Sequence, residues 1–480
     1  MAIVLEERAD ITLDVARQVA FGQSGVRLGE RAIAKMAHAR RAFERLIEEP
    51  GIVIYGVTSG YGQHAHLRFS PEERRQHARK PPIAAQAHWG EPFPERAVRL
   101  MVLARLANFI EGHAAVTPAL AEKVAAMLDG PLPPVPLDGA VCAGEILPLS
   151  WLFGPLAATV DLKEKESLSL INGAPLAAAL VADGALIAER RLAIAEEIFA
   201  LAAEAYKVPV AHFSVATAKL QGDPHEIRAA ERLSALIAGG TADRRPYQAP
   251  VTFRILPKML GRLRRDLSRA QEAARISLSQ VSDNPTYFPP DDDSSNGEIH
   301  STGGYHNAAA WPALNALAMA YADLTTLCDR IIARLLDGNT SGLPPQLMPP
   351  GTGDEHAVYL GTLGFAVVGY GEAARRAAQA VFLPGSESGG FVQNDVAVPT
   401  ALAWKGQEDA GRMLDLCLGA VAVTAVRAFE VTDRAPPPAL KSVFALVETL
   451  RRESATIPAP GKIAGQVTDD IRLRINGTVS

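Results

Sequence analysis

Apolar residues recur at the helical period over long stretches of this chain. The clearest stretches are residues 175–208, 313–337 and 407–431, and Pro175 stands where a first helical turn would begin. Few charged residues interrupt any face of these stretches, which is typical of helices in the centre of a large bundle or at a subunit interface. Strands do not alternate with helices, and no internal repeat is visible. The pattern predicts a mainly α-helical fold.

Composition restricts the class of protein. The chain has 480 residues, of which 48% are hydrophobic and 21% charged, with a formal net charge of −5. This balance is ordinary for a globular protein, and it predicts neither a nucleic-acid partner nor a membrane partner. The most apolar stretch, 414–429, is short for a membrane span, and the first residues do not read as a signal peptide. We therefore expect a cytoplasmic protein.

Cysteine and histidine give no sign of a metal centre. The three cysteines, Cys142, Cys328 and Cys417, are far apart and form no zinc-binding spacing. The histidines at 64, 66, 77 and 88 match no known zinc pattern either, so we predict no metal site.

The stretch GAVCAGEILPL at 139–149 raises the main chemical question. Two small residues, Ala143 and Gly144, separate Cys142 from an apolar run that contains Pro148. On its own the stretch can be a plain loop, a reactive cysteine or the remains of a catalytic device.

Eight segments, in the same order along the chain, resemble motifs of the aromatic amino acid and histidine ammonia-lyases. They are YGVTSGYG (55–62), RLANFIEGHAAV (105–116), SLINGAP (169–175), YQAPVTFRILPKMLG (247–261), SDNPTYF (282–288), STGGYHN (301–307), RLLDGNTSGLPPQL (334–347) and QNDV (393–396). The resemblance covers roughly residues 10 to 430. It implies a mainly α fold with a long central helix bundle, assembled as a homotetramer whose active sites each draw on three subunits.

The resemblance also implies a division of the chain. Residues 1–200 would form an N-terminal helical domain with the tyrosine loop, 201–435 the central bundle, and 436–480 a C-terminal helix or cap. The partners it implies are a small amino-acid-like substrate and other copies of the chain.

The family's cofactor is the point at which this chain departs. In the family, an Ala-Ser-Gly tripeptide at this position cyclises and dehydrates to methylideneimidazolone, an electrophile, and the serine hydroxyl is the leaving oxygen. Here Cys142, Ala143 and Gly144 stand between Val141 and Glu145, so the serine is either deleted or replaced by Ala143. We therefore expect no methylideneimidazolone and no other cofactor.

Several catalytic and binding positions of the family are matched. Tyr55 matches the base on the mobile loop, which a lowered phenol pKa would activate, and Gly60 lies in the same loop. Arg254 matches the arginine that holds the substrate carboxylate. Asn172 would hydrogen-bond the carboxylate or amine region, and Tyr305, where the family has phenylalanine, could stack on a ring or face a cation.

The remaining substrate-facing candidates are Gln86, Asn394 and Glu145. Gln86 and its neighbour Ala85 stand where the family recognises the substrate ring, and Asn394 lies in the QNDV segment. Glu145 could face a cationic group or cap the following helix, and the cap is favoured.

Other family positions have changed. The tyrosine three residues before the arginine is Val251, the asparagine of the Gly-Gly-Asn-Phe-His stretch is Gly304, and the glutamate that handles the substrate amine falls at about Gly390. Residues that manage a primary amine are thus missing, whereas the base and the carboxylate anchor remain.

This combination predicts a carbon–nitrogen lyase that works without the electrophile. Its substrate needs a leaving group that is already good, such as the trimethylamine of an aromatic or imidazole amino-acid betaine, and ergothioneine and hercynine are examples. The alternatives are a cyclase or conjugate-addition catalyst on the same fold, a catalytically silent homologue that acts by binding, and a lyase whose serine was replaced by design.

Overall fold

The computed structural model describes residues 2–290, 296–348, 358–386, 393–453 and 459–477. The chain divides into two compact units. The first contains Met1–Leu186, Ala270–Leu314 and Ala380–Trp404, and the second contains Ile187–Arg269, Asn315–Gln379 and Lys405–Ser480. Each unit is therefore assembled from three separated segments, whereas the sequence suggested contiguous domains divided at residues 200 and 435.

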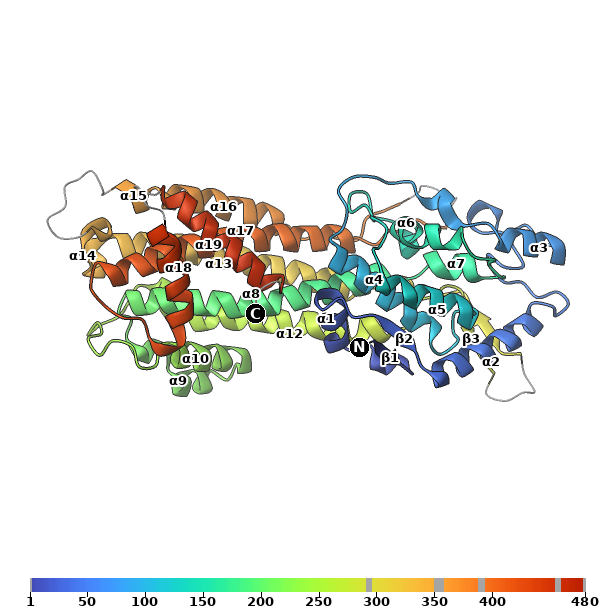
Figure 1. Cartoon of the computed structure of the whole chain (residues 1–480), viewed down its shortest axis with the longest axis horizontal. Coiled ribbons are helices and arrows are strands. Elements are labelled where there is room, and N and C mark those ends of the chain that lie inside the picture. The colour runs from blue at the N-terminus through green and yellow to red at the C-terminus, as the bar shows by residue number, and fades with distance from the viewer. Residues whose placement is uncertain (1, 291–295, 349–357, 387–392, 454–458, 478–480) are drawn as a thin grey trace. The chain divides into compact units, whose positions relative to one another are not determined.

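The first unit is mainly helical and holds two short sheets (Figure 1). Its helices are α1 (Leu13–Phe21), α2 (Glu30–Leu46), α3 (Pro71–Ala78), α4 (Glu95–Phe109), α5 (Pro118–Ala126), α6 (Ile146–Ala157) and α7 (Glu166–Ile171). Strand β1 (Ile3–Leu5) pairs in parallel with β2 (Val26–Leu28), and β3 (Thr286–Phe288) pairs antiparallel with β4 (Glu298–His300). Every residue of α4 from Ala97 to Phe109 is buried, so this helix forms the centre of the unit.

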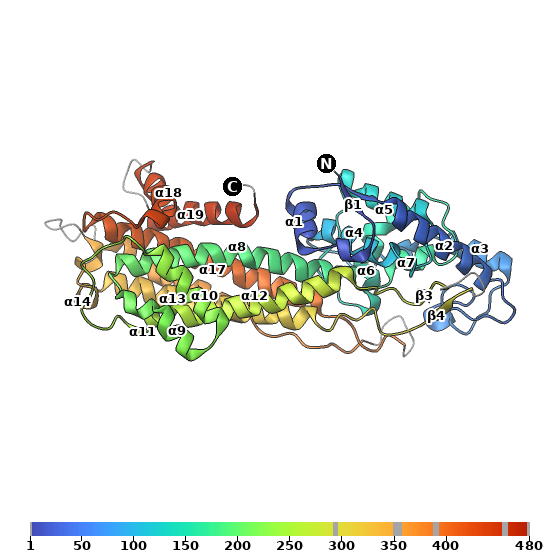
Figure 2. The same ribbon diagram turned by 90° about the horizontal axis from the view of Figure 1, so that it is seen from below.

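In the described part of the chain, four long helices each contribute residues to both units. They are α8 (Pro175–Ala205), α12 (Leu256–Ser279), α13 (Ala310–Leu336) and α17 (Thr400–Glu430). Three of them, α8, α13 and α17, confirm the helices predicted at 175–208, 313–337 and 407–431. In the second unit their segments lie alongside one another as a bundle (Figure 2).

Shorter helices complete the second unit. They are α9 (Val215–Gln221), α10 (Pro224–Leu236), α11 (Val251–Arg254), α14 (Gly338–Ser341), α15 (Val358–Gly361), α16 (Leu363–Ala377), α18 (Lys441–Glu453) and α19 (Pro460–Ile475). Helices α18 and α19 pack on each other and form the C-terminal element predicted after residue 435.

Among the described residues, one helical stretch is long and apolar enough to cross a membrane, by length and composition alone. It is Glu166–Ala205 rather than the 414–429 segment singled out from the sequence, and 94% of its most apolar window is buried inside the protein. Such burial is the behaviour of a core helix. The cytoplasmic location stays a prediction.

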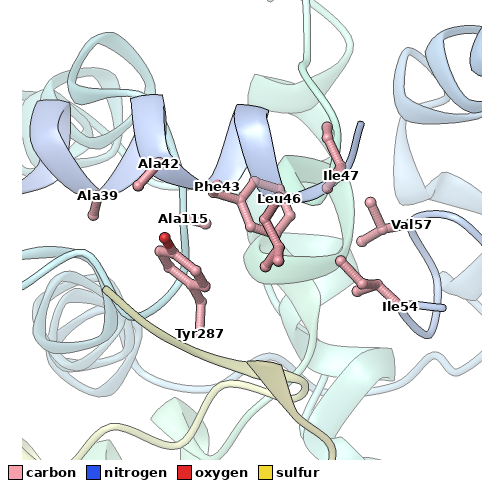
Figure 3. Close-up of a cluster of buried hydrophobic side chains, with 9 residues drawn as sticks. All are labelled: Ala39, Ala42, Phe43, Leu46, Ile47, Ile54, Val57, Ala115 and Tyr287. Atoms are coloured by element: carbon pink, nitrogen blue, oxygen red, sulfur yellow. The ribbon is translucent and has the colours of Figure 1, made fainter. Parts of the chain in front are cut away.

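A hydrophobic cluster in the first unit fixes the loop that carries Tyr55. It contains Ala39, Ala42, Phe43, Leu46, Ile47, Ile54, Val57, Ala115 and Tyr287, all drawn in Figure 3. Phe43 of α2 meets the Tyr287 ring edge-on at 5.3 Å between centroids. Ile54 and Val57 are 1% and 2% exposed, so the residues on both sides of Tyr55–Gly56 are anchored in the core. The backbone of Tyr55 is thereby held while its side chain stays outside the cluster.

Candidate active site

A cavity of about 970 Å³ lies in the first unit, and it collects residues from seven separated parts of the chain. All of the described residues that line it belong to this unit. The lining residues are Tyr55, Gly56, Tyr61, Gly62, His77, Ala78, Lys80, Pro81, Pro82, Ala84, Ala85, Ala87, Ala143, Gly144, Ile146, Leu147, Lys165, Ser167, Leu168, Ile171, Asn172, Asn284, Ser301, Thr302, Gly303, Tyr305, Gln393 and Asn394. Seven of the positions named from the sequence are among them: Tyr55, Ala85, Ala143, Gly144, Asn172, Tyr305 and Asn394.

The loop of Tyr55 is shaped by its own hydrogen bonds. The Thr58 hydroxyl accepts from the Ile54 N–H at 2.7 Å and donates to the Ile52 carbonyl at 3.0 Å. A side chain at Gly60 would lie 2.3 Å from the carbonyl oxygen of His64, so only glycine fits this turn. Gly60, predicted as a catalytic position, does not line the cavity, and its contribution here is to the turn.

The Tyr55 hydroxyl accepts a hydrogen bond from the backbone N–H of Gly62 at 2.9 Å. Burial raises the pKa of Tyr55 above its usual range, the Gly62 N–H opposes this, and Tyr305 and Tyr61 add to the rise. The expectation of a lowered phenol pKa is therefore wrong for the chain alone, because no described cation lies close enough to offset burial.

The altered segment 142–145 forms a tight turn at the start of α6. Gly144 and Glu145 both have left-handed backbone angles, with φ of 66° and 56°. A Cβ on Gly144 would lie 2.6 Å from the Asn172 side-chain oxygen, so glycine lets the turn approach Asn172 closely. Ala143 and Gly144 line the cavity, whereas Cys142 does not.

Cys142 is poorly suited to act as a nucleophile. Burial raises the pKa of its thiol to about 12, and the nearby Glu145 adds to the rise. The thiol therefore stays protonated at neutral pH, which leaves little thiolate for attack.

Glu145 is wholly enclosed and acts as a helix cap. Its carboxylate accepts from the backbone N–H groups of Leu176 and Ala177 at 2.6 and 2.9 Å. These donors belong to the first turn of α8, so Glu145 caps α8 and not α6, the helix that directly follows it. Burial raises the pKa of Glu145 to about 8, although both N–H groups and Arg105 oppose the rise.

Asn172 holds two walls of the cavity together. It is 8% exposed, and its amide nitrogen donates to the Asn284 carbonyl at 3.0 Å. The Asn284 side chain in turn accepts from the backbone N–H of Thr302 at 2.9 Å. The side-chain oxygen of Asn172 faces the turn at Gly144, which leaves it as the acceptor at this wall.

A buried group of charged residues borders the cavity, and the sequence did not indicate it. Lys165 lines the cavity with a fully buried side chain, forms a short ion pair with Asp283, and donates to the Ser169 hydroxyl at 2.9 Å. Burial lowers the pKa of Lys165, and Asp283 opposes this. Arg105 donates to the Asn172 carbonyl at 3.0 Å, but its Nε and Nη2 have no hydrogen-bond partner.

The sequence segments that contain Arg105 and Asp283 were recognised, but neither segment shows that the two residues come together. Arg105 begins the segment 105–116, and Asp283 lies in 282–288, yet nothing in either segment says that they meet.

The other predicted positions fall outside the cavity lining. Gln86 donates its amide to the Ser150 carbonyl of α6 at 3.0 Å, which ties the Pro82–Ala85 turn to that helix. Arg254 ends α11 in the second unit, and its buried Nε has no hydrogen-bond partner. Val251 is an exposed residue of the same helix, Gly304 is exposed beside the lining, and Gly390 lies outside the described residues.

One edge of the cavity is formed by the C-terminal end of α3. Ser70 and Glu73 cap its start reciprocally, and Pro71 occupies its first turn. At the other end the His77 ring contacts the rings of Tyr61 and Phe69 at 5.3 and 4.9 Å between centroids.

The described residues contain no group of three or more histidine, cysteine or acidic side chains that could hold a metal ion. Methylideneimidazolone does not fit the residues present, because no serine stands between Val141 and Glu145, and the two residues of this turn that line the cavity, Ala143 and Gly144, bring no hydroxyl. The chemistry proposed below therefore does not pass through that group.

Comparison with known proteins decides the family. The model of the family described as aromatic amino acid lyase matches residues 11–161 and 157–449. This chain belongs to that family. The histidine ammonia-lyase of Symbiobacterium thermophilum is 30% identical over 369 residues, which cover 71% of this chain and 72% of the relative. That of Paracidovorax citrulli is 28% identical over 368 residues, covering 70% and 71%.

Solved structures share the fold of this lyase-family chain over its whole length. A tyrosine aminomutase from Streptomyces globisporus superimposes with a TM-score of 0.84 at 23% identity, covering 100% of this chain and 98% of the other. The ergothioneine-degrading enzyme ergothionase from Treponema denticola superimposes with a TM-score of 0.88 at 17% identity, covering 100% of both chains. Family membership makes this chain a carbon–nitrogen lyase in kind, with amino-acid-like small molecules as the substrates of its family.

Proposed function

We propose that this lyase eliminates a tertiary amine from an amino-acid betaine without an electrophilic cofactor, and that trimethylamine is the amine. The observation that carries the proposal is the composition of one cavity wall. Ala143 lines the cavity in place of the family's serine, while Tyr55 and Asn172, the matched base and polar anchor, line the same cavity.

The absence of the family's serine restricts which leaving group the enzyme can expel. A primary amine is a poor leaving group, and the family's electrophile overcomes this by covalent attachment. A quaternary ammonium needs no such help, since it departs as a neutral amine. Tyr55 as phenolate takes a proton from the β-carbon, the C–H electrons form the Cα–Cβ double bond, and the Cα–N bond electrons leave with the amine. The products are an α,β-unsaturated acid and trimethylamine.

A permanently cationic substrate also offsets the raised pKa of Tyr55. A positive charge near a phenol favours its ionised form, and the Gly62 N–H already stabilises an oxygen anion at that point. The substrate would thus activate its own base on binding.

Aromatic rings supply the surface for this cation. Tyr55, Tyr61 and Tyr305 all line the cavity, and the described lining residues include no aspartate or glutamate. Ring faces attract a quaternary ammonium, which has no N–H proton and needs no acid or base in order to leave.

The substrate carboxylate requires a further donor, and we assign it to Arg254 of another copy of the chain. Arg254 is half-buried, and no ion pair to its guanidinium is found within the described part of the chain, so the group keeps donors for a carboxylate. This assignment presumes the family's homotetramer, with sites shared between subunits.

The test is to mix purified protein separately with ergothioneine, hercynine, histidine, phenylalanine and tyrosine, and to follow the unsaturated acid by its ultraviolet absorbance. We expect product from at least one betaine and none from the three primary amino acids. Product from a primary amino acid alone would show that an electrophile forms after all, and absence of product from every compound would favour the cyclase or binding alternatives.

Tyr55→Phe removes the base and should lower kcat for the accepted betaine by about 1,000-fold. The free energy of unfolding should change little, because the phenol's one described hydrogen bond is to a loop N–H. Steady-state kinetics and urea unfolding measure the two effects. A kcat within about threefold of wild type would eliminate Tyr55 as the base.

A further inference from the structure

The charges on the cavity lining are unbalanced. The described lining residues include two lysines, Lys80 and Lys165, and no acidic residue. The buried Lys165 is neutralised by Asp283. Lys80 is exposed, and no ion pair to it is found within the described part of the chain. Its charge is therefore available to a ligand.

The backbone of Lys80 is fixed at the edge of the cavity. Its N–H donates to the His77 carbonyl at 3.2 Å, and its carbonyl accepts from the Ser167 hydroxyl of α7 at 2.9 Å. Pro81 and Pro82 follow directly, and their rings restrict the chain further. A fixed backbone with a free, charged side chain is what a binding residue requires.

Among the described lining residues, Lys80 is the cation without an ion pair, because Lys165 is paired with Asp283. Burial lowers the pKa of His77, and the Lys80 charge lowers it further, so the imidazole is neutral at neutral pH. The lining residues next along the chain, Pro81 to Ala87, are small and uncharged. A betaine whose aromatic ring is uncharged has only its head carboxylate to offer this ammonium group, and that carboxylate is assigned above to Arg254.

We propose that the substrate carries an anionic group on its ring or side chain, in addition to its amino-acid head, and that Lys80 binds it. This proposal rests on the proposed function, because it assigns the amino-acid head to Tyr55, Asn172 and Arg254. Lys80 is then a specificity-determining residue that selects acidic members of the betaine class.

The experiment compares two ligands that differ by one charge. They are the trimethyl betaine of phenylalanine and its 4-carboxylate derivative, titrated by calorimetry into wild-type protein and into Lys80→Ala, Lys80→Gln and Lys80→Arg. Lys163→Ala is the matched control, since Lys163 is an exposed lysine paired with Asp161 at 2.6 Å and does not line the cavity.

Wild-type protein and Lys163→Ala should bind the carboxylate derivative roughly tenfold more tightly than the parent betaine. Lys80→Ala and Lys80→Gln should lose this preference, and Lys80→Arg should keep most of it. The preference should weaken as salt is added, because Lys80 is exposed.

The inference is overturned if wild-type protein shows no preference, if Lys80→Ala keeps the preference, or if neither ligand binds. Its failure is separable from failure of the proposed function. If Lys80 governs the preference but neither ligand is turned over, the role of Lys80 in binding stands and the proposed elimination is contradicted. If the ligands are turned over but Lys80→Ala keeps the preference, the elimination stands and the role of Lys80 is contradicted.

Discussion

Two buried arginines, one in each unit, are used in opposite ways. In the second unit Arg191 of α8 grips Asp415 of α17 through two hydrogen bonds, Nε to Oδ1 at 2.8 Å and Nη2 to Oδ2 at 3.1 Å. Among the described residues of the first unit, Arg105 of α4 donates a hydrogen bond to the Asn172 carbonyl alone, and its nearest carboxylate oxygen, on Asp283, is 4.0 Å away.

The pKa values of the two guanidinium groups reflect this difference. Burial acts to lower the pKa of Arg191, but Asp415 and Tyr321 more than offset it, so the pKa is raised. Burial lowers the pKa of Arg105 to about 10, because Asp283 and Glu145 offset it only in part. Arg191 therefore joins α8 to α17 through a buried ion pair. Arg105 is a costly buried charge whose one hydrogen bond holds the wall of the cavity at Asn172.

Asp415→Ala should produce the largest loss of stability. It leaves the Arg191 guanidinium buried without its carboxylate, which costs about 4 kcal/mol of unfolding free energy. Urea unfolding measures this cost, and kcat/KM of the folded fraction should stay near wild type. A sharp fall in kcat/KM with an unchanged unfolding free energy would show that the Arg191–Asp415 pair does not serve mainly to join the two helices.

Glu145→Gln should change how stability depends on pH. The pKa of Glu145 is raised from its usual value to about 8, so the stability it contributes is greatest below its unfolded pKa of 4.5 and is lost as pH rises towards 8. Relative to the variant, wild-type protein should lose about 3 kcal/mol between pH 5 and pH 7.5. Unfolding curves at several pH values test this. A difference that does not vary with pH would contradict the raised pKa.

Arg105→Met should separate the two kinds of buried arginine. Since Arg105 makes one described hydrogen bond, its loss should change the unfolding free energy by only about 1 kcal/mol. Because the Asn172 carbonyl loses its donor, kcat/KM for the accepted betaine should fall roughly 30-fold, or about 2 kcal/mol. Urea unfolding and steady-state kinetics, measured on the same preparation of the variant, give the two effects side by side. A large loss of unfolding free energy with unchanged kcat/KM would show that Arg105 stabilises the fold, as Arg191 does, and does not support the cavity wall.

Ser167→Ala should have the smallest effect. It removes the hydrogen bond that holds the Lys80 backbone at 2.9 Å, and this should weaken binding of the carboxylate betaine about threefold. Thr159→Val is the control, because it also removes a hydroxyl bonded to a main-chain carbonyl, that of Leu156 at 2.8 Å, outside the cavity lining. Equal effects of the two variants on calorimetric affinity would show that the Ser167 contact does not position Lys80.

The sequence predicted the parts of this structure that depend on local pattern. Helices α8, α13 and α17 follow from uninterrupted apolar periodicity, and the cavity residues Tyr55 and Asn172 lie in segments recognisable by themselves. The contiguous domain division did not anticipate the two units. Their boundary falls inside long helices, where the apolar period continues unchanged.

Contacts between distant residues could not be predicted in this way. Glu145 caps α8 by accepting a hydrogen bond from Leu176, 31 residues later in the chain, and Lys165 pairs with Asp283, 118 residues away. No spacing rule connects such positions. The same limit applies to the Tyr55 pKa, which burial sets and which the loop motif does not reveal.

The most direct test of the account is a competition between hercynine and histidine, which differ only in the three methyl groups on the nitrogen. The two are mixed in equal amounts with purified wild-type protein, and the released amine is identified. Cofactor-free elimination predicts trimethylamine and no ammonia, because the turn at Ala143 supplies no electrophile and only the quaternary nitrogen can leave unaided. Release of ammonia from histidine would contradict it.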